Sequence, residues 1–122
     1  MKLITKELKE RFAQVGEQAE TNALVIAKYF NPCGSQTWYA TEYDSELNNC
    51  YGYVTGMYVD EWGYFSIDEL EQLALPFGLT IERDIHFTEK SISQCVPAIK
   101  RKLELERINK AHEQHNNQEH ER

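Results

Sequence analysis

The sequence Asp60-Glu61-Trp62-Gly63-Tyr64-Phe65-Ser66 runs directly into Ile67-Asp68-Glu69-Leu70, so that a strand composition meets a helix start with no loop between them. Residues 62–65 are aromatic apart from one glycine, which is typical of a β-strand. Ser66 and Glu69 have the spacing of a capping box, in which each side chain bonds the backbone amide of the other residue. The stretch therefore predicts a short strand that ends where a helix begins.

Further strand compositions lie on both sides of this stretch, and short turn-forming segments separate them. On the N-terminal side they cover residues 24–30, 37–43 and 50–58. Strands that are joined by short turns pair antiparallel. On the C-terminal side, residues 79–84 alternate with Leu79 and Ile81 inward, which predicts an edge strand.

Three segments carry helix signals. The first covers residues 5–15 and ends at Gly16, a residue that readily terminates a helix. The second follows Ser66, and its apolar face consists of Ile67, Leu70, Leu73 and Ala74. The third starts at Pro97, because proline suits the first turn of a helix.

Together these elements predict an α+β fold. We expect a mostly antiparallel meander sheet of four to five strands, covered by the first two helices on one face, in a single domain over residues 1–96. A C-terminal helix over residues 97–111 follows. Residues 112–122 include no aliphatic residue and no Phe, Trp or Tyr, so we expect a disordered tail there.

The charge of the chain is concentrated in its middle. Residues 37–89 hold eleven carboxylates against the single basic residue Arg83, a net charge of −10, whereas the whole chain carries −7. A surface of that sign repels nucleic-acid phosphate and attracts basic proteins. The charge pattern therefore predicts a protein partner with a basic surface and makes direct nucleic-acid binding an unfavourable reading.

Cysteine usage and hydropathy point to a cytoplasmic protein. The three cysteines, Cys33, Cys50 and Cys95, cannot all pair with one another, and none lies at CxxC spacing. The N-terminus lacks the apolar run of a signal peptide, and no apolar stretch approaches the length of a membrane span. We expect no membrane attachment, and the sequence leaves open whether the chain forms a homo-oligomer.

The sequence offers weak signals for two kinds of catalytic or metal site. Structural zinc sites use paired ligands, whereas the three cysteines and His86 are scattered singly. Magnesium prefers carboxylate oxygens, and Glu42, Asp60 and Glu61 could serve a magnesium-dependent phosphoesterase or nuclease. No motif names a reaction, so we expect a protein that is not an enzyme and has no metal or cofactor.

A binding patch is the alternative use of the same carboxylates. Alternation places Tyr39 and Tyr43 on one side of their strand, while Asp60 and Glu61 precede another strand of the same sheet, with Glu42 near the rim. Tyrosine offers contact area at low entropic cost, and carboxylates select basic partners. We predict that these five residues form one contiguous partner-binding patch.

The sequence also resembles a bacterial domain-of-unknown-function family that is carried on plasmids, conjugative elements and phages, often near antirestriction genes. The matching stretches include Lys28-Tyr29-Phe30-Asn31-Pro32, Thr37-Trp38-Tyr39-Ala40-Thr41-Glu42-Tyr43 and Glu61-Trp62-Gly63-Tyr64-Phe65-Ser66. They span roughly residues 1–90, and the helix after Pro97 reads as an addition. The resemblance implies that the protein is encoded on a mobile element, and it implies no particular reaction.

The resemblance to a family carried on mobile elements and the acidic charge of the chain together suggest a function. We expect a non-catalytic acidic protein-binding domain of a mobile element or phage, which inhibits a host nucleic-acid-targeting defence system of the CRISPR or restriction type. Its carboxylates would stand where phosphates stand in the defence complex. The alternatives are the magnesium-dependent phosphoesterase and a single-strand nucleic-acid-binding accessory of element transfer.

Overall fold

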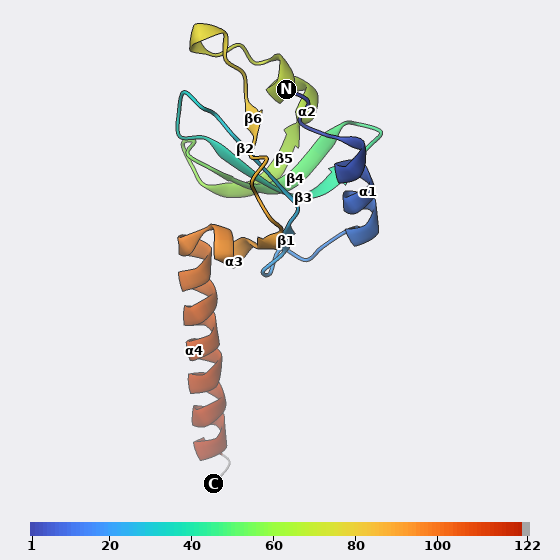
Figure 1. Ribbon diagram of the computed structural model, residues 1–122. Helices are drawn as coiled ribbons and strands as arrows, with labels where there is room; N and C mark the ends of the chain where they lie inside the picture. The colour runs from blue at the N-terminus through green and yellow to red at the C-terminus, as the bar shows by residue number, and fades with distance from the viewer. Residues whose placement is uncertain (121–122) are drawn as a thin grey trace.

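A five-stranded antiparallel sheet with the strand order β5-β4-β3-β2-β6 forms the centre of the computed structural model (Figure 1). The structure describes residues 1–120, and it describes side chains through residue 115. The strands are β2 (Ala27–Phe30), β3 (Thr37–Asp44), β4 (Asn49–Thr55), β5 (Glu61–Ser66) and β6 (Glu82–Arg83). The predicted α+β class, the antiparallel meander and the edge position of the last strand are confirmed.

A second, two-stranded sheet was not predicted. The expected strand over residues 24–30 is interrupted at Ile26, and its first part, β1 (Leu24–Val25), pairs with β7 (Lys90–Ser91) instead of continuing β2. The helical elements are α1 (Lys6–Val15), α2 (Ile67–Gln72), the 3₁₀ turn η1 (Pro76–Gly78), α3 (Ile92–Cys95) and α4 (Pro97–His120). The chain therefore crosses from one sheet to the other at Ile26.

Helix α2 begins at Ile67 as predicted, and the Glu69 amide donates to the Ser66 hydroxyl over 3.1 Å. The return bond of the predicted capping box, from the Ser66 amide to the Glu69 carboxylate, is absent among the described residues. The helix ends at Gln72, however, so Leu73 lies outside it and is exposed. The predicted inward position of Leu79 is also wrong, since only Ile81 is buried there. The backbone is already extended at Leu73, and Pro76 prevents the helix from resuming at Leu75, because proline disfavours helical geometry in the residue before it.

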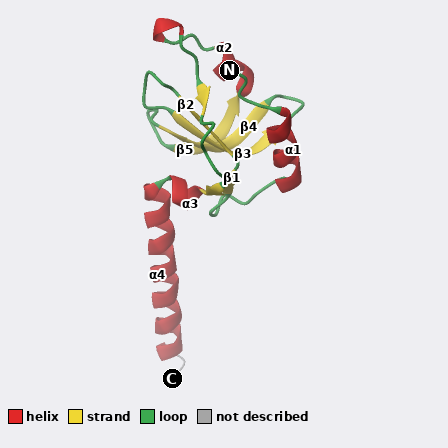
Figure 2. Cartoon of the chain, in the orientation of Figure 1, coloured by secondary structure: helices red, strands yellow, loops and turns green. Residues whose placement is uncertain are grey.

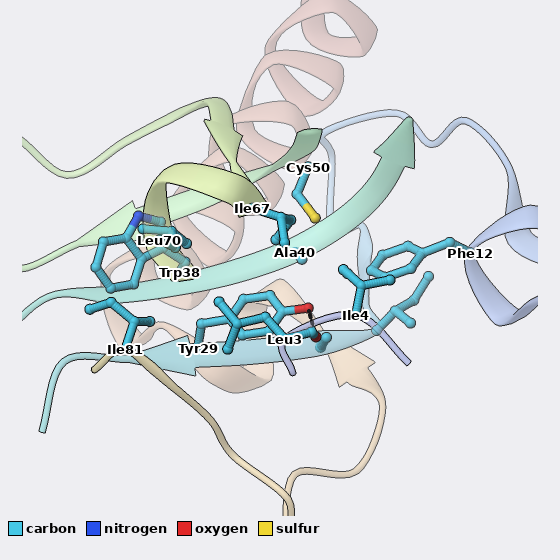
Figure 3. Packing of buried hydrophobic residues seen from close by; sticks show 12 residues of the cluster. Leu3, Ile4, Phe12, Tyr29, Trp38, Ala40, Cys50, Ile67, Leu70 and Ile81 are labelled. Atoms are coloured by element: carbon cyan, nitrogen blue, oxygen red, sulfur yellow. Dashed lines mark hydrogen bonds between the residues drawn. The ribbon is translucent and has the colours of Figure 1, made fainter. Parts of the chain in front are cut away.

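The main hydrophobic core lies on one face of the sheet, which we call the core face. Helices α1 and α2 and the N-terminal segment cover it (Figure 1). At its centre the buried Tyr29 hydroxyl donates to the Leu3 carbonyl over 2.8 Å (Figure 3). The core residues include Leu3, Ile4, Phe12, Tyr29, Trp38, Ala40, Cys50, Ile67, Leu70 and Ile81. This arrangement agrees with the predicted cover of one face by the first two helices.

A β-bulge in β3 changes which side chains face the core. Ala40 pairs with Gly52 and Glu42 pairs with Tyr51, so Thr41 is the extra residue. Tyr43 then lies opposite Cys50 on the core face. Without the bulge, alternation would have put the Glu42 carboxylate beside Cys50, where an ion would be buried among apolar side chains at high cost.

The bulge is held in place by polar contacts from a distant loop. The Gln18 amide nitrogen donates to the carbonyls of Thr41 (3.0 Å) and Leu24 (2.9 Å), and its amide oxygen accepts from the Leu24 backbone amide at 2.7 Å. The Thr41 hydroxyl itself donates to the Tyr51 carbonyl over 3.1 Å. Because these contacts satisfy backbone groups that the bulge leaves unpaired, Gln18 fixes both the bulge and the start of β1.

The opposite face of the sheet, which we call the outer face, carries a smaller second cluster. Val25, Ile92 and Val96 are its buried members. Tyr39, Tyr53, Trp62, Phe87, Cys95 and Ile99 pack against them. Helix α3 and the first turn of α4 thus cover part of the face opposite the one for which cover was predicted.

Helix α4 extends away from both sheets as a single projecting rod (Figure 1, Figure 2). It runs from Pro97 to His120, so it continues past the predicted end at residue 111. Residues 112–120 of the predicted tail are therefore helical, and the Glu and Gln residues among them favour helix. Residues 121–122 of that tail lie outside the described part of the chain.

No helix in the described part of the chain has the length and apolar character that crossing a membrane requires.

The role of Gln18 can be tested by stability measurements. We expect Gln18→Ala to lower the free energy of unfolding by roughly 2 kcal/mol, because it leaves carbonyl and amide groups at the bulge without partners. Urea denaturation followed by circular dichroism measures the change. Gln114→Ala, on the exposed part of α4, is the control and should change stability by less than about 0.5 kcal/mol. Equal stabilities of the two variants would contradict the assigned role.

Candidate protein-binding surface

Four aromatic side chains from β4 and β5 form a continuous strip on the outer face. We call Tyr51, Tyr53, Trp62 and Tyr64 the aromatic strip. Tyr51 stacks on Trp62 with the ring centroids 6.0 Å apart and an interplanar angle of 11°. Tyr64 meets the edge of Tyr51 at 4.7 Å, and Tyr53 meets Trp62 at 5.3 Å. Tyr64 is 78% exposed, so the strip ends in an aromatic ring that a partner can reach.

The strip follows from the alternation of hydrogen bonds between β4 and β5. The Ile67 amide donates to the Asn48 carbonyl over 3.0 Å, which makes this pair a hydrogen-bonded one. Alternation in an antiparallel ladder then makes Tyr51–Tyr64 and Tyr53–Trp62 non-hydrogen-bonded pairs, in which side chains approach most closely. The sequence signal for this strip is the repeat of aromatic residues at every second position on both sides of one turn.

An acidic hollow of about 510 Å³ lies at one end of the strip, between the loop after α1 and the β3–β4 turn. Tyr51 and Tyr64 line it on the strip side. Its carboxylates are Glu17, Glu42, Asp44 and Glu46, and no Lys, Arg or His from the described part of the chain lines it. We call it the first hollow, and its charge favours a cationic occupant.

A second hollow of similar volume, about 510 Å³, lies at the other end of the strip. Tyr53 and Trp62 line it, together with the first turns of α4. Its charged residues are Glu20, Asp60, Glu61, Glu106 and Lys102. Both hollows are therefore acidic, and the aromatic strip connects them.

The two tyrosines of the predicted patch do not lie on one face. Tyr39 packs in the second cluster on the outer face, whereas Tyr43 packs on the core face with its ring centroid 5.8 Å from that of Phe12. The Tyr43 hydroxyl donates to Asn48 over 2.7 Å. The prediction that alternation puts both tyrosines on one side is wrong, because the bulge at Thr41 reverses the alternation between them.

The three predicted carboxylates are also separated. Glu42 lies in the first hollow, while Asp60 and Glu61 lie in the second. Glu42 accepts the Gln18 backbone amide at 3.2 Å, and Asp60 accepts the Gly56 amide at 3.1 Å. Both therefore support loops. In the described part of the chain, the Glu61 side chain has no hydrogen bond or ion pair, so it is the member of the predicted patch best placed to meet a partner.

The other candidate ligands and nucleophiles lie in different parts of the fold. Cys33 is exposed, Cys95 is half-buried in α3, and Cys50 is buried in the core, where desolvation raises the pKa of its thiol. Among the residues that the structure describes, no three His, Cys, Asp or Glu side chains gather where they could hold one metal ion. The arrangement therefore offers acidic contact surface more readily than a catalytic constellation.

Tyr51 links the strip to a carboxylate. Its hydroxyl donates to Glu20 Oε2 over 2.7 Å. This hydrogen bond raises the pKa of Tyr51 to about 12, with smaller contributions from burial and from the negative charge of Glu20. The protonated phenol is the favoured form in the fold, so the bond stabilises the surface below the ordinary tyrosine pKa and is lost as the pH rises through about 12.

This hydrogen bond predicts the titration of a single residue. We expect Tyr51 to stay protonated at about pH 11, one unit above the ordinary tyrosine pKa. The ¹³C NMR signal of its ring carbon, assigned by comparison with Tyr51→Phe, reports the protonation state. In Glu20→Gln the midpoint should fall toward the ordinary value. An ordinary midpoint in the unsubstituted chain would show that the bond to Glu20 is absent in solution.

Comparison with known proteins places the chain in a family. It matches the family described as a protein of unknown function (DUF2958) over residues 2–105. The match extends into α4, so the expectation that everything after Pro97 is an addition is wrong for residues 97–105. No curated protein and no solved structure matches the chain. Because the match covers most of the sequence, this chain belongs to the DUF2958 family.

Proposed function

We propose that this chain is a non-catalytic protein-binding domain that receives a basic surface of another protein across its aromatic strip and two hollows. The observation that carries the proposal is the charge of these hollows. Their carboxylates are Glu17, Glu20, Glu42, Asp44, Glu46, Asp60, Glu61 and Glu106, and among the described side chains Lys102 is the one cation that lines them. A basic partner would meet an acidic recess at each end of one aromatic surface.

The chemistry of the strip suits the same kind of partner. An arginine or lysine that lies over the face of an exposed tyrosine or tryptophan gains a cation–π contact. Tyr64 presents such an exposed ring, and the half-buried Trp62 lies on the same face of the strand between the two hollows. The carboxylates would steer a cationic protein toward the surface, and the rings would supply contact area once it arrives.

The resemblance to a family that is carried on plasmids, conjugative elements and phages suggests what kind of protein the partner is. A cytoplasmic defence complex that grips nucleic acid has a basic groove, and an acidic protein can occupy that groove in place of phosphates. We infer an inhibitor of a host nucleic-acid-targeting defence system, of the anti-CRISPR or antirestriction type. The separation of Glu42 from Asp60 and Glu61 gives no support to the magnesium-dependent alternative.

The proposal predicts the effect of reversing charges on the surface. Glu17, Glu46 and Glu61 have no side-chain hydrogen bond or ion pair in the described part of the chain, so their joint substitution by lysine should leave the fold intact. We expect the unsubstituted chain to raise phage plaque counts on a host with active restriction or CRISPR interference. The triple variant should lose that protection by about tenfold or more, because its hollows would repel a basic groove.

A matched control variant tests whether the effect depends on where the charges are reversed or only on the change in net charge. Glu10→Lys, Glu104→Lys and Glu113→Lys together change the net charge equally at exposed positions outside both hollows. This control should protect as well as the unsubstituted chain. The proposed function fails if the unsubstituted chain protects against neither defence system. The proposed surface fails if the first triple variant, folded by circular dichroism, still protects fully.

A further inference from the structure

Strand β5 is the outermost strand of the large sheet, and it pairs only with β4 among the described residues. The hydrogen-bonded pair Ile67–Asn48 sets the alternation along the strand. Trp62 and Tyr64 therefore belong to non-hydrogen-bonded pairs, and their backbone N–H and C=O groups point toward the free edge. These groups offer hydrogen bonds to a further strand.

The edge lacks most of the usual features that prevent strand addition. Natural edge strands are often protected by charged side chains, lysine above all, by proline or by a bulge, and β5 has one charged side chain, Glu61, at its first position. Residues 61–66 contain no lysine and no proline, and the β4–β5 register runs without a shift from Glu61 to Ser66. The strand at the opposite edge, β6, has only two residues. The structure therefore leaves one long edge that is open to pairing.

An apolar groove follows the core-face side of this edge. It has a volume of about 430 Å³. Its lining is mostly apolar and includes one carboxylate, Glu61, as well as atoms of Trp62 and Tyr64; the other lining residues are Trp38, Val54, Met57, Tyr58, Val59, Gly63 and Phe65. Gly63 lies in the middle of β5, and a Cβ atom built there would meet nothing within 4 Å. The missing side chain leaves room for an apolar side chain from an added strand.

The outer-face side of the same edge has the opposite chemistry. There Trp62 and Tyr64 present their rings beside the Tyr51–Glu20 pair, between the two acidic hollows. Successive side chains of a β-strand point to opposite faces. An added strand would therefore place alternate side chains in an apolar groove and the others on an acidic aromatic surface.

We propose that β5 binds its partner by strand addition, and that the partner segment is an extended strand in which apolar residues alternate with lysine or arginine. This inference rests on the proposed function and adds the binding mode. The groove and the aromatic strip lie on opposite faces of the β5 edge, so a strand whose side chains alternate between apolar and basic fits both of them. A second copy of this chain is disfavoured as the occupant, because its own β5 edge would bring a like-charged acidic surface against the first.

The test uses a blocked peptide of about eight residues, the length of a long strand, in which valine and lysine alternate. A block peptide with the same composition but all valines before all lysines removes the period, and an alternating valine–glutamate peptide reverses the charge. Binding is measured by calorimetry with the full chain. Hydrogen exchange of the Trp62 and Tyr64 amides, measured by NMR, reports pairing at the edge.

Two substitutions test the edge itself. Tyr64→Pro removes an outward N–H, while Tyr64→Val removes the same ring and keeps that N–H. We expect Tyr64→Pro to bind the alternating peptide about tenfold more weakly than Tyr64→Val, the effect of one lost hydrogen bond. Gly63→Val adds a side chain whose Cβ atom meets nothing within 4 Å, and it should weaken binding by a similar factor because it occupies the groove. Circular dichroism checks that each variant folds.

The outcomes separate this proposal from the proposed function. Strand addition is supported if only the alternating lysine peptide binds and slows exchange at Trp62 and Tyr64. It is overturned, while the acidic surface stands, if the block peptide binds equally well with both amides unprotected. Lack of binding by the alternating lysine peptide overturns it as well. A dimer of the free chain with both amides already protected would mean that a second copy fills the edge, and this also overturns the proposal.

Discussion

The bulge at Thr41 is the constraint on which the rest of this structure depends. It removes Glu42 from the core face and turns Tyr43 onto that face, where its ring packs near Phe12. The polar groups that the bulge would leave unpaired are satisfied by Gln18 and by the Thr41 hydroxyl. Because unpaired buried groups are costly, the loop after α1 and the centre of the sheet must fold together.

The same local change shapes the candidate surface. Glu42 joins the carboxylates of the first hollow because the bulge brings it opposite Tyr51. Between β4 and β5 the hydrogen-bond alternation does two things at once. It brings the side chains of Tyr51 and Tyr64 close together, and it leaves the backbone of Tyr64 facing the open edge. The rings and the free edge of β5 are therefore two results of one register.

Local signals in the sequence predicted more of the fold than of the surface. Ser66 caps α2 as its spacing predicts, and the antiparallel meander follows from short turns. The bulge could not be predicted, because its support comes from Gln18, far away in the sequence. Asp60, predicted as part of the contact patch, instead accepts the amide of Gly56 four residues away, a loop contact that strand alternation does not reveal. Periodicity reports local alternation and misses contacts of this kind.

The central claim is that the bulge places Tyr39 and Tyr43 on opposite faces of the sheet. Nuclear Overhauser contacts in the full-length protein test this directly. The structure predicts contacts between the Tyr43 and Phe12 rings, and contacts of the Tyr39 ring with the second cluster around Val96. Contacts of both tyrosine rings with that second cluster, and none between Tyr43 and Phe12, would show regular alternation through Thr41 and contradict the account.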